Sequence, residues 1–194
     1  LFLEGPQLFS PVSDHKRRMV LIGGFLGAGK TTLIGWLSRW LEQRSLRLGL
    51  VTNDQGRGLM DTVSARNSSA EVEVQEITGG CFCCRLDELV GAVEQLDTTA
   101  RPDVIVAEPV GSCTDLMATV ILPLERVYQV PFSLAPLSVV LDARRALAAL
   151  GGKRHARDFH RDVGYVFRKQ VEEAEWLVVN KCDLMTADEL ADLL

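Results

Sequence analysis

The chain lacks several features that would place it in a common functional class. No apolar run reaches the roughly 18 residues that a membrane helix needs, so we expect no membrane span. The net charge of −5 and the pI near 5.3 argue against a nucleic-acid binder that relies on a basic face. Only five cysteines occur, an odd number, and adjacent Cys83 and Cys84 suit a disulfide framework poorly. These absences predict a cytoplasmic protein with free or metal-bound thiols.

Short apolar runs alternate with amphipathic segments along the 194 residues. The apolar runs, expected to be strands, are 19–24, 46–53, 72–77, 103–109, 137–143 and 175–180. The segments expected to be helices are 30–43, 84–97, 113–122, 144–150 and 158–174, and Thr186 with Glu189 predicts a capped final helix. Buried strands separated by helices are typical of an α/β protein with a mostly parallel central sheet and helices on both faces.

The first expected helix follows a glycine-rich loop, GFLGAGKTT at residues 24–32, which matches the phosphate-binding pattern G-x-x-x-x-G-K-[ST]. Glycines let backbone amides curl around phosphate oxygens, and the helix N-terminus adds the positive end of its dipole. Lys30 is expected to reach the β- and γ-phosphates and Thr31 to coordinate Mg²⁺. The residues expected to bind the phosphates are Gly24, Gly27, Ala28, Gly29, Lys30, Thr31 and Thr32. The loop predicts that the chain binds a nucleoside triphosphate.

A second motif, NKCD, ends the last expected strand and supplies Asn180, Lys181 and Asp183 in the pattern N-K-x-D. In this position Asp183 would accept hydrogen bonds from the guanine ring, Lys181 would pack along the base plane and Asn180 would tie the loop together. Adenine has no matching donors, and a carboxylate left unpaired disfavours it by about 10³-fold or more. The motif therefore favours GTP over ATP.

Acidic residues that follow two other strands are candidates for Mg²⁺ binding and catalysis. Glu108, in the segment AEPVG, is placed to hold Mg²⁺ through water, and the amide of Gly111 could sense the γ-phosphate. The polar, glycine-broken segment at 51–62 resembles a mobile switch, in which Asp54 is the first candidate to contact Mg²⁺ or position the attacking water, and Asp61 the second. Either aspartate could instead be an ordinary turn residue.

Three thiols lie within four positions, at Cys81, Cys83 and Cys84, directly after Gly79 and Gly80. Metal binding, redox chemistry and simple burial all predict such a cluster. The paired glycines favour a backbone bent around something, and we favour metal binding over the other two. Thiolates bind Zn²⁺ well and favour Zn²⁺ or Cu(I) over harder ions. Three protein ligands would leave one position open for exchange with a donor or a client.

The fourth metal ligand is left open by the sequence. It could be water, Cys113, a residue outside this chain or a thiolate from a second molecule, whereas His155 and His160 are disfavoured by their five-residue spacing. Burial as a small apolar side chain is the simpler expectation for Cys113 and Cys182. Arg85 could help to lower the thiol pKa values.

Taken together, GFLGAGKTT, TNDQG, GGCFCC, EPVG and NKCD resemble the CobW/HypB/UreG group of P-loop GTPases, most closely its CobW-like metallochaperone branch. The resemblance implies a low-turnover GTPase that uses GTP, GDP and Mg²⁺ and delivers Zn²⁺ or another transition metal to a client metalloprotein. One departure is the switch sequence, where that branch has N-E-x-G and this chain has Asp54 as the acid. A homodimer is left open.

The expected organisation is a tail or trimmed remnant at residues 1–17, followed by a P-loop GTPase domain at 18–194. We expect this domain to be incomplete at its C-terminus and to lack the family's client-selecting domain. Three other interpretations remain: a regulatory GTPase with a purely structural metal, a P-loop kinase of a small molecule, and a non-catalytic binding module. The kinase would leave N-K-x-D and C-x-C-C unexplained. In our interpretation, GTP and Mg²⁺ order the thiol loop into a metal-binding form and hydrolysis loosens it.

Overall fold

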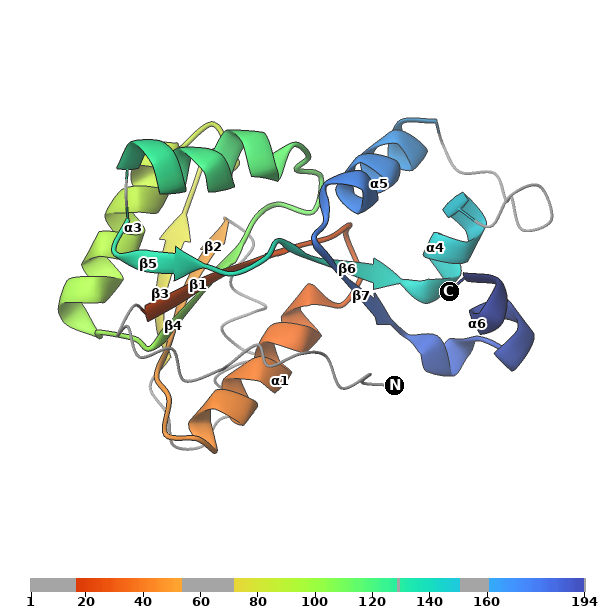
Figure 1. Cartoon of the computed structure of the whole chain (residues 1–194), viewed down its shortest axis with the longest axis horizontal. Coiled ribbons are helices and arrows are strands. Elements are labelled where there is room, and N and C mark those ends of the chain that lie inside the picture. Colours follow the sequence, from red (N-terminus) through yellow and green to blue (C-terminus); the bar gives the residue numbers. More distant parts are fainter. Residues whose placement is uncertain (1–16, 54–71, 129, 151–160, 194) are drawn as a thin grey trace.

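The computed structural model describes residues 17–53, 72–128, 130–150 and 161–193 of the chain, and Figure 1 shows its elements. All six expected strands are present within two residues of the expected bounds. They are β1 (Arg17–Gly23), β2 (Leu48–Asn53), β3 (Glu73–Ile77), β4 (Val104–Glu108), β6 (Ser138–Asp142) and β7 (Trp176–Asn180). A three-residue strand, β5 (Phe132–Leu134), was not expected, because its short apolar stretch lies between Pro131 and Pro136.

The described strands form one parallel sheet in the order β3-β2-β4-β1-β6-β7, and β5 pairs with β1 beside this row. This order differs from the order of the strands in the sequence, and parallel neighbours are joined by crossover connections that contain the helices. Because every strand runs the same way, all of their carboxyl ends meet at one edge. The loops after β1, β2, β3, β4 and β7, which carry the predicted motifs, therefore gather along that edge.

The helices agree with the expected segments except in one region. They are α1 (Lys30–Glu42), α3 (Leu86–Thr99), α4 (Ala143–Leu150), α5 (Arg161–Glu173) and α6 (Ala187–Leu193). The helix expected at 113–122 begins at residue 116 and continues to 128 as two π-helical segments, η1 (Met117–Ile121) and η2 (Leu124–Tyr128). Pro123 lies between the two segments and has no amide proton to donate, which interrupts the usual α-helical bonding there.

The final helix begins as its capping pattern predicts. The Thr186 amide donates to a Glu189 carboxylate oxygen at 2.9 Å, and the Glu189 amide donates to the Thr186 hydroxyl at 3.2 Å. The predicted capping box is therefore confirmed.

Two apolar clusters lie on opposite faces of the sheet, which makes the fold three-layered (Figure 1). Along β4, Val104 and Val106 belong to the cluster that includes α1, while Ile105 and Ala107 belong to the cluster that includes α3, η1 and α5. The alternation follows from the two-residue period of a strand, and both faces are apolar because both are covered by helices. The predicted three-layer α/β fold is confirmed.

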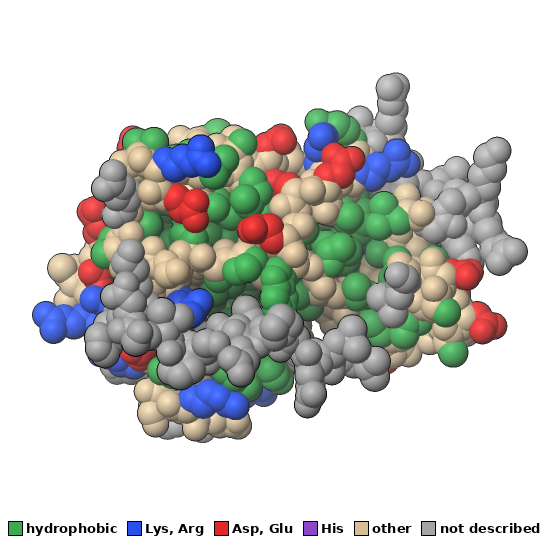
Figure 2. Space-filling model, in the orientation of Figure 1, with side chains coloured by type: hydrophobic (Ala, Val, Ile, Leu, Met, Phe, Trp, Pro, Cys, Tyr) green, Lys and Arg blue, Asp and Glu red, His purple; other side chains and the backbone are tan. Residues whose placement is uncertain are grey.

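On the face shown in Figure 2, Lys and Arg side chains are interspersed with Asp and Glu, and apolar side chains gather between the helices. Within the described ranges, no helix combines the length and the apolar character needed to cross a membrane.

Candidate functional site

The loop between β1 and α1 has the backbone conformation that its glycines make accessible. Gly24 and Gly29 have φ values of 131° and 103°, in the region that other residues rarely adopt. A Cβ atom at Gly24 would lie 2.3 Å from the carbonyl oxygen of Val140, and one at Gly29 would lie 2.0 Å from the Asn180 side-chain nitrogen. Both positions therefore require glycine, for backbone conformation and for space.

The start of α1 is prepared for an anion. Its N-cap is Gly29, which has no side chain to cap the first-turn amides, so these donors are available to a ligand. The Lys30 ammonium donates to the Gly24 carbonyl at 3.0 Å and lies 3.7 Å from a Glu108 carboxylate oxygen. Burial lowers the pKa of Lys30 and raises that of Glu108, although each charge opposes the shift of the other. A negatively charged phosphate beside Lys30 would stabilise the protonated ammonium and so oppose the effect of burial.

A cavity of about 340 Å³ opens beside this loop, and we call it the nucleotide cavity. Among the predicted site residues, its lining includes Gly27, Gly29, Lys30, Thr31, Thr32, Glu108, Gly111 and Lys181. Thr52 lines it as well, although the sequence analysis did not select this residue. Its side chain is 2% exposed, and its hydroxyl oxygen has no hydrogen-bond partner among the described residues.

Thr52 and Glu108 are register partners on the neighbouring strands β2 and β4, so both side chains reach the cavity from the same edge of the sheet. With Thr31, they place three oxygen-bearing side chains around it, and oxygen ligands are what Mg²⁺ prefers. The unpartnered Thr52 hydroxyl is an observation that fits a hydrated Mg²⁺ at this point. Sequence reasoning could have found Thr52 from one signal, a hydroxyl side chain near the end of an otherwise apolar strand.

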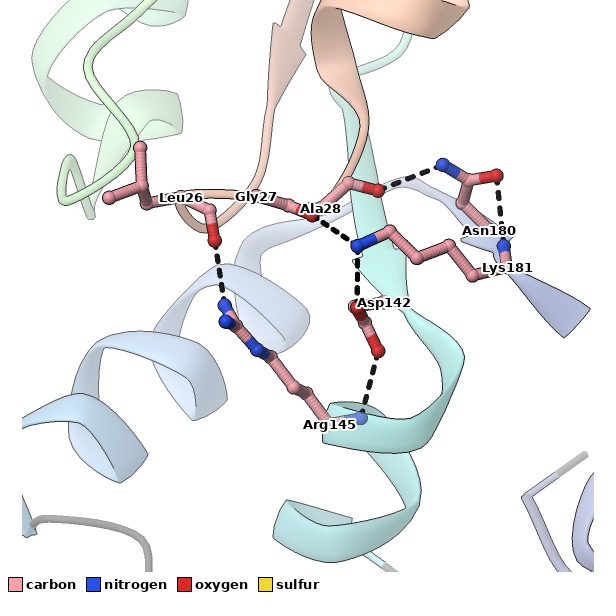
Figure 3. Close-up of polar contacts among 7 residues, drawn as sticks. All are labelled: Leu26, Gly27, Ala28, Asp142, Arg145, Asn180 and Lys181. Atoms are coloured by element: carbon pink, nitrogen blue, oxygen red, sulfur yellow. Dashed lines mark hydrogen bonds and ion pairs between the residues drawn. The ribbon is translucent and has the colours of Figure 1, made fainter. Parts of the chain in front are cut away.

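Three side chains, one from α4 and two from the end of β7, donate hydrogen bonds to carbonyls of the phosphate loop (Figure 3). The donors and acceptors are Asn180 Nδ2 to the Ala28 carbonyl at 2.9 Å, Lys181 Nζ to Gly27 at 2.6 Å, and an Arg145 guanidinium nitrogen to Leu26 at 2.7 Å. Because these three carbonyls are fixed by hydrogen bonds, the orientation of the peptide units in the loop is set before a ligand binds. We call this set the carbonyl clamp.

Asp142, at the end of β6, lies between two members of the carbonyl clamp and contacts both (Figure 3). One of its carboxylate oxygens accepts from Lys181 Nζ at 2.8 Å, and the other accepts from the Arg145 amide at 3.1 Å. Burial opposes ionisation, but these hydrogen bonds hold the pKa of Asp142 below its usual value. The sequence analysis missed Asp142 and Arg145, because neither belongs to a motif.

The three clustered cysteines lie on a tight turn after β3. Gly79 has a φ of 75°, the Asn53 side chain donates to the Gly80 carbonyl, and the Cys84 amide donates to the Cys81 carbonyl at 3.0 Å. Phe82 is 0% exposed and fixes the turn to the core. These contacts fix the backbone that presents the thiols.

The sulfur atoms are close enough to share one ion. Cys81 lies 2.9 Å from Cys83 and 3.2 Å from Cys84, and Cys83 lies 4.0 Å from Cys84. Zinc–sulfur bonds of about 2.3 Å at tetrahedral angles put sulfur atoms roughly 3.8 Å apart. An ion would therefore need only a small spreading of Cys81 from its neighbours.

The thiols differ in how readily they ionise. Burial alone would raise the pKa of Cys81, but hydrogen bonds from Cys83 and Cys84 lower it to about 7. Burial and the neighbouring Cys81 raise the pKa of Cys83 to about 12. Arg85, which we expected to help lower the thiol pKa values, is not among the groups that lower the pKa of Cys81. The guanidinium instead contacts Glu88 at 3.0 Å and the Thr78 carbonyl at 3.3 Å.

A second cavity, of about 560 Å³, lies over this turn, and we call it the thiol cavity. Its lining is Asn53, Gly79, Gly80, Cys81, Cys83, Val110, Ser112, Cys113 and Thr114. Asn53 and Val110 line the nucleotide cavity too, so the two cavities are neighbours.

Several predicted residues lie elsewhere. Asp183 is exposed and is not among the residues that line the nucleotide cavity. Cys182 is half-buried, and its thiol contacts the Val179 carbonyl at 3.5 Å. Asp54, Asp61, His155 and His160, together with the tail at 1–16, lie outside the described residues.

The fold and the phosphate loop define the class of this protein as a P-loop nucleotide-binding domain. Comparison with known proteins gives the family. Residues 18–194 match the family described as "CobW/HypB/UreG, nucleotide-binding domain", and the chain belongs to it. The family expected from the motifs is thereby confirmed.

Individual relatives carry names from the CobW-like branch. The chain is 28% identical over 192 residues to the "Zinc chaperone CobW" of a Sinorhizobium species, covering 88% of this chain and 52% of that protein. It is 30% identical over 178 residues to the "Zinc chaperone YeiR" of Escherichia coli K12, covering 88% and 48%. Among solved structures, a Zn(II)-bound triple mutant of the YjiA GTPase has a TM-score of 0.57 at 18% identity, covering 90% and 52%. The chain spans about half the length of these relatives.

Proposed function

We propose that this chain is the nucleotide-binding part of a GTP-hydrolysing metallochaperone that holds and transfers a thiophilic metal, with zinc as the first candidate. The observation that carries the proposal is the adjacency of the two cavities, which share Asn53 and Val110. One offers phosphate-binding amides and a lysine, and the other offers thiols at metal-binding separations. The names of the relatives support zinc as the cargo and a GTPase as the carrier.

In this proposal the nucleotide cavity binds the phosphates of GTP. Lys30 leaves the Gly24 carbonyl to bind the β- and γ-phosphates, and the amides at the start of α1 bind the phosphate oxygens. Thr31, Glu108 and Thr52 would hold Mg²⁺, Glu108 through a water molecule, and the ion would supply positive charge to the phosphate oxygens. Asp54 positions the attacking water, and the Gly111 amide contacts the γ-phosphate.

Guanine selection is assigned to Asp183, which would accept from the base, with Lys181 packed along the base plane. The role proposed for Asn180, tying the loop together, is supported by two hydrogen bonds: its side chain accepts from the Lys181 amide at 2.9 Å and donates to the Ala28 carbonyl at 2.9 Å. We expect GTP to bind at least about 10³-fold more tightly than ATP. Equilibrium titrations with both nucleotides measure this ratio, and equal affinities would exclude GTP specificity.

The cargo ion is assigned to Cys81, Cys83 and Cys84. Asn53 links the nucleotide to these thiols. It lies at the end of β2, lines the nucleotide cavity and donates to the carbonyl of Gly80, the residue before Cys81. Metal and nucleotide would then be coupled by about 1–3 kcal/mol, which corresponds to about 5–150-fold in affinity. Because coupling is reciprocal, the metal must change GTP affinity by the same factor as GTP changes metal affinity. A client metalloprotein would receive the ion.

The test is a Zn²⁺ titration of the purified, reduced protein against a competing chelator, with a non-hydrolysable GTP analogue, GDP or no nucleotide. Tighter binding with the GTP analogue than with GDP is expected. Cys83→Ala should abolish most of the binding, whereas Cys182→Ala, a matched change outside the cluster, should leave it unchanged. Single-turnover GTP hydrolysis is measured in parallel. Failure of the wild-type protein to bind Zn²⁺ in every nucleotide state would refute the carrier function.

A further inference from the structure

The loop that follows β4 touches both cavities within six residues. At its start, Glu108 lies 3.7 Å from the Lys30 ammonium. In its middle, Gly111 lines the nucleotide cavity so closely that a Cβ atom there would lie 2.9 Å from the Leu26 amide nitrogen. At its end, Cys113 lines the thiol cavity together with Cys81 and Cys83. A single short segment therefore contacts the phosphate loop at one end and carries a fourth thiol at the other.

The Cys113 side chain faces the cluster from within the core. It is 8% exposed, and Cys81 and Cys83 pack against the same apolar cluster. Burial and the charge of Cys81 raise the pKa of Cys113 to about 12. The thiols of residues 81 and 113, which are far apart in the sequence, thus line one cavity in the fold.

Hydrogen bonds tie the backbone at Gly111 to the backbone at Cys113. The Cys113 amide donates to the Val110 carbonyl at 2.9 Å, which closes a turn. Gln170 of α5, 1% exposed, donates to the carbonyls of Gly111 at 3.0 Å and Cys113 at 2.9 Å. The positions of Gly111 and Cys113 are therefore linked through shared hydrogen-bond partners.

The three-cysteine turn leaves a tetrahedral ion one ligand short. Cys113 lines the same cavity as two of these thiols, while Cys182 contacts the Val179 carbonyl at the end of β7. Joining the ion requires the Cys113 sulfur to approach to the roughly 3.8 Å separation of a tetrahedral site. The loop that carries it also lines the nucleotide cavity, through Gly111.

We propose that Cys113 is the fourth, nucleotide-dependent ligand of the cargo ion. This inference rests on the proposed metal-binding function. With GTP, the phosphate holds Gly111 and the ion has four thiolates. With GDP, the loop relaxes, Cys113 leaves and water takes its position, so the ion becomes exchangeable. In this proposal the loop after β4 and the sulfur atom of Cys113 couple nucleotide binding to metal binding.

The number of sulfur ligands tests this directly. X-ray absorption spectroscopy of the anaerobic protein loaded with Zn²⁺ should give four sulfurs with the GTP analogue and three sulfurs plus one lighter atom with GDP. In Cys113→Ser, three sulfurs are expected in both states. Its Zn²⁺ affinity with the GTP analogue should fall by about 10–100-fold, at least the loss seen for groups that only support a ligand. The ratio of affinities with the GTP analogue and GDP should approach 1.

Each result has a separate meaning. Cys182→Ser is the matched control and should keep both the sulfur count and the affinity ratio. Three sulfurs in the wild-type protein with both nucleotides would overturn the assignment of Cys113, while the carrier function would stand if the affinity ratio persists. The same conclusion follows if Cys113→Ser, or Cys113→Ala should the serine variant fold poorly, retains that ratio. Absence of any sulfur-bound ion in the wild-type protein would instead refute the proposed function.

Discussion

The ion pair between Asp142 and Lys181 offers a quantitative test of the carbonyl clamp. In Asp142→Asn the side chain keeps its shape but loses its charge, so Lys181 Nζ loses a carboxylate at 2.8 Å and keeps only the Gly27 carbonyl at 2.6 Å. The Asp142 side chain is 12% exposed and that of Lys181 is 35% exposed. The exposure of the pair is therefore intermediate between that of a fully buried and that of a fully exposed ion pair.

The magnitude follows from these exposures. Breaking a buried pair costs about 3–5 kcal/mol, while an exposed pair contributes about 0.2–1 kcal/mol. A hydrogen bond to a charged group contributes about 1.5–3 kcal/mol, and solvent at Lys181 reduces this value. We expect Asp142→Asn to lower the free energy of unfolding by about 1.5 kcal/mol. GTP affinity should fall by about tenfold if the carbonyl clamp orients the phosphate loop.

A double-mutant cycle with Lys181→Met isolates the pair, measured by urea unfolding without nucleotide. A coupling energy of about 1–1.5 kcal/mol is expected, and a value below about 0.3 kcal/mol would show that the clamp is not stabilised by this contact. The pH dependence provides a second check. Because the pKa of Asp142 is lowered in the folded protein, its stabilising effect is present above about pH 4 and is lost as the pH falls through the folded value. Asp142→Asn should remove this part of the acid destabilisation.

Two further predictions concern the thiol turn. Phe82→Ala should lower the free energy of unfolding by about 3–5 kcal/mol because it empties a fully buried site, whereas Val127→Ala, at a side chain 72% exposed, should change it by less than about 0.5 kcal/mol. Equal effects of the two changes in urea unfolding would contradict the anchoring role of Phe82. Zn²⁺ affinity should rise by at least about tenfold per pH unit between pH 7 and 9, because the ion displaces a proton from Cys83, and more steeply below pH 7, where Cys81 is protonated too. A pH-independent affinity in chelator-competition titrations would show that these thiols do not bind the ion.

Much of the fold was predictable because each strand and helix has its own local pattern. The apolar runs of β2 and β4 and the amphipathic α1 carry their periodicity within a few residues, and their bounds agree closely with expectation. The prediction failed in two places, for different reasons. β5 is only three residues long and exists because the distant strand β1 pairs with it. The segment after Asp115 is helical as expected, but around Pro123 its hydrogen bonds are of the π-helical type, which the apolar periodicity did not indicate.

The sequence by itself determined the chemistry available to this protein: a phosphate loop, a guanine-type motif, three adjacent thiols and the family to which they belong. These features are readable because each requires particular residues at short, fixed spacing. Only the tertiary structure decided which of these groups meet. The sheet order places β3 and β4 on either side of β2, so the loops at their carboxyl ends meet: Asn53 hydrogen-bonds to the thiol turn, and Cys113 lines the same cavity as Cys81. Such contacts depend on strand order and loop direction, which no local spacing encodes.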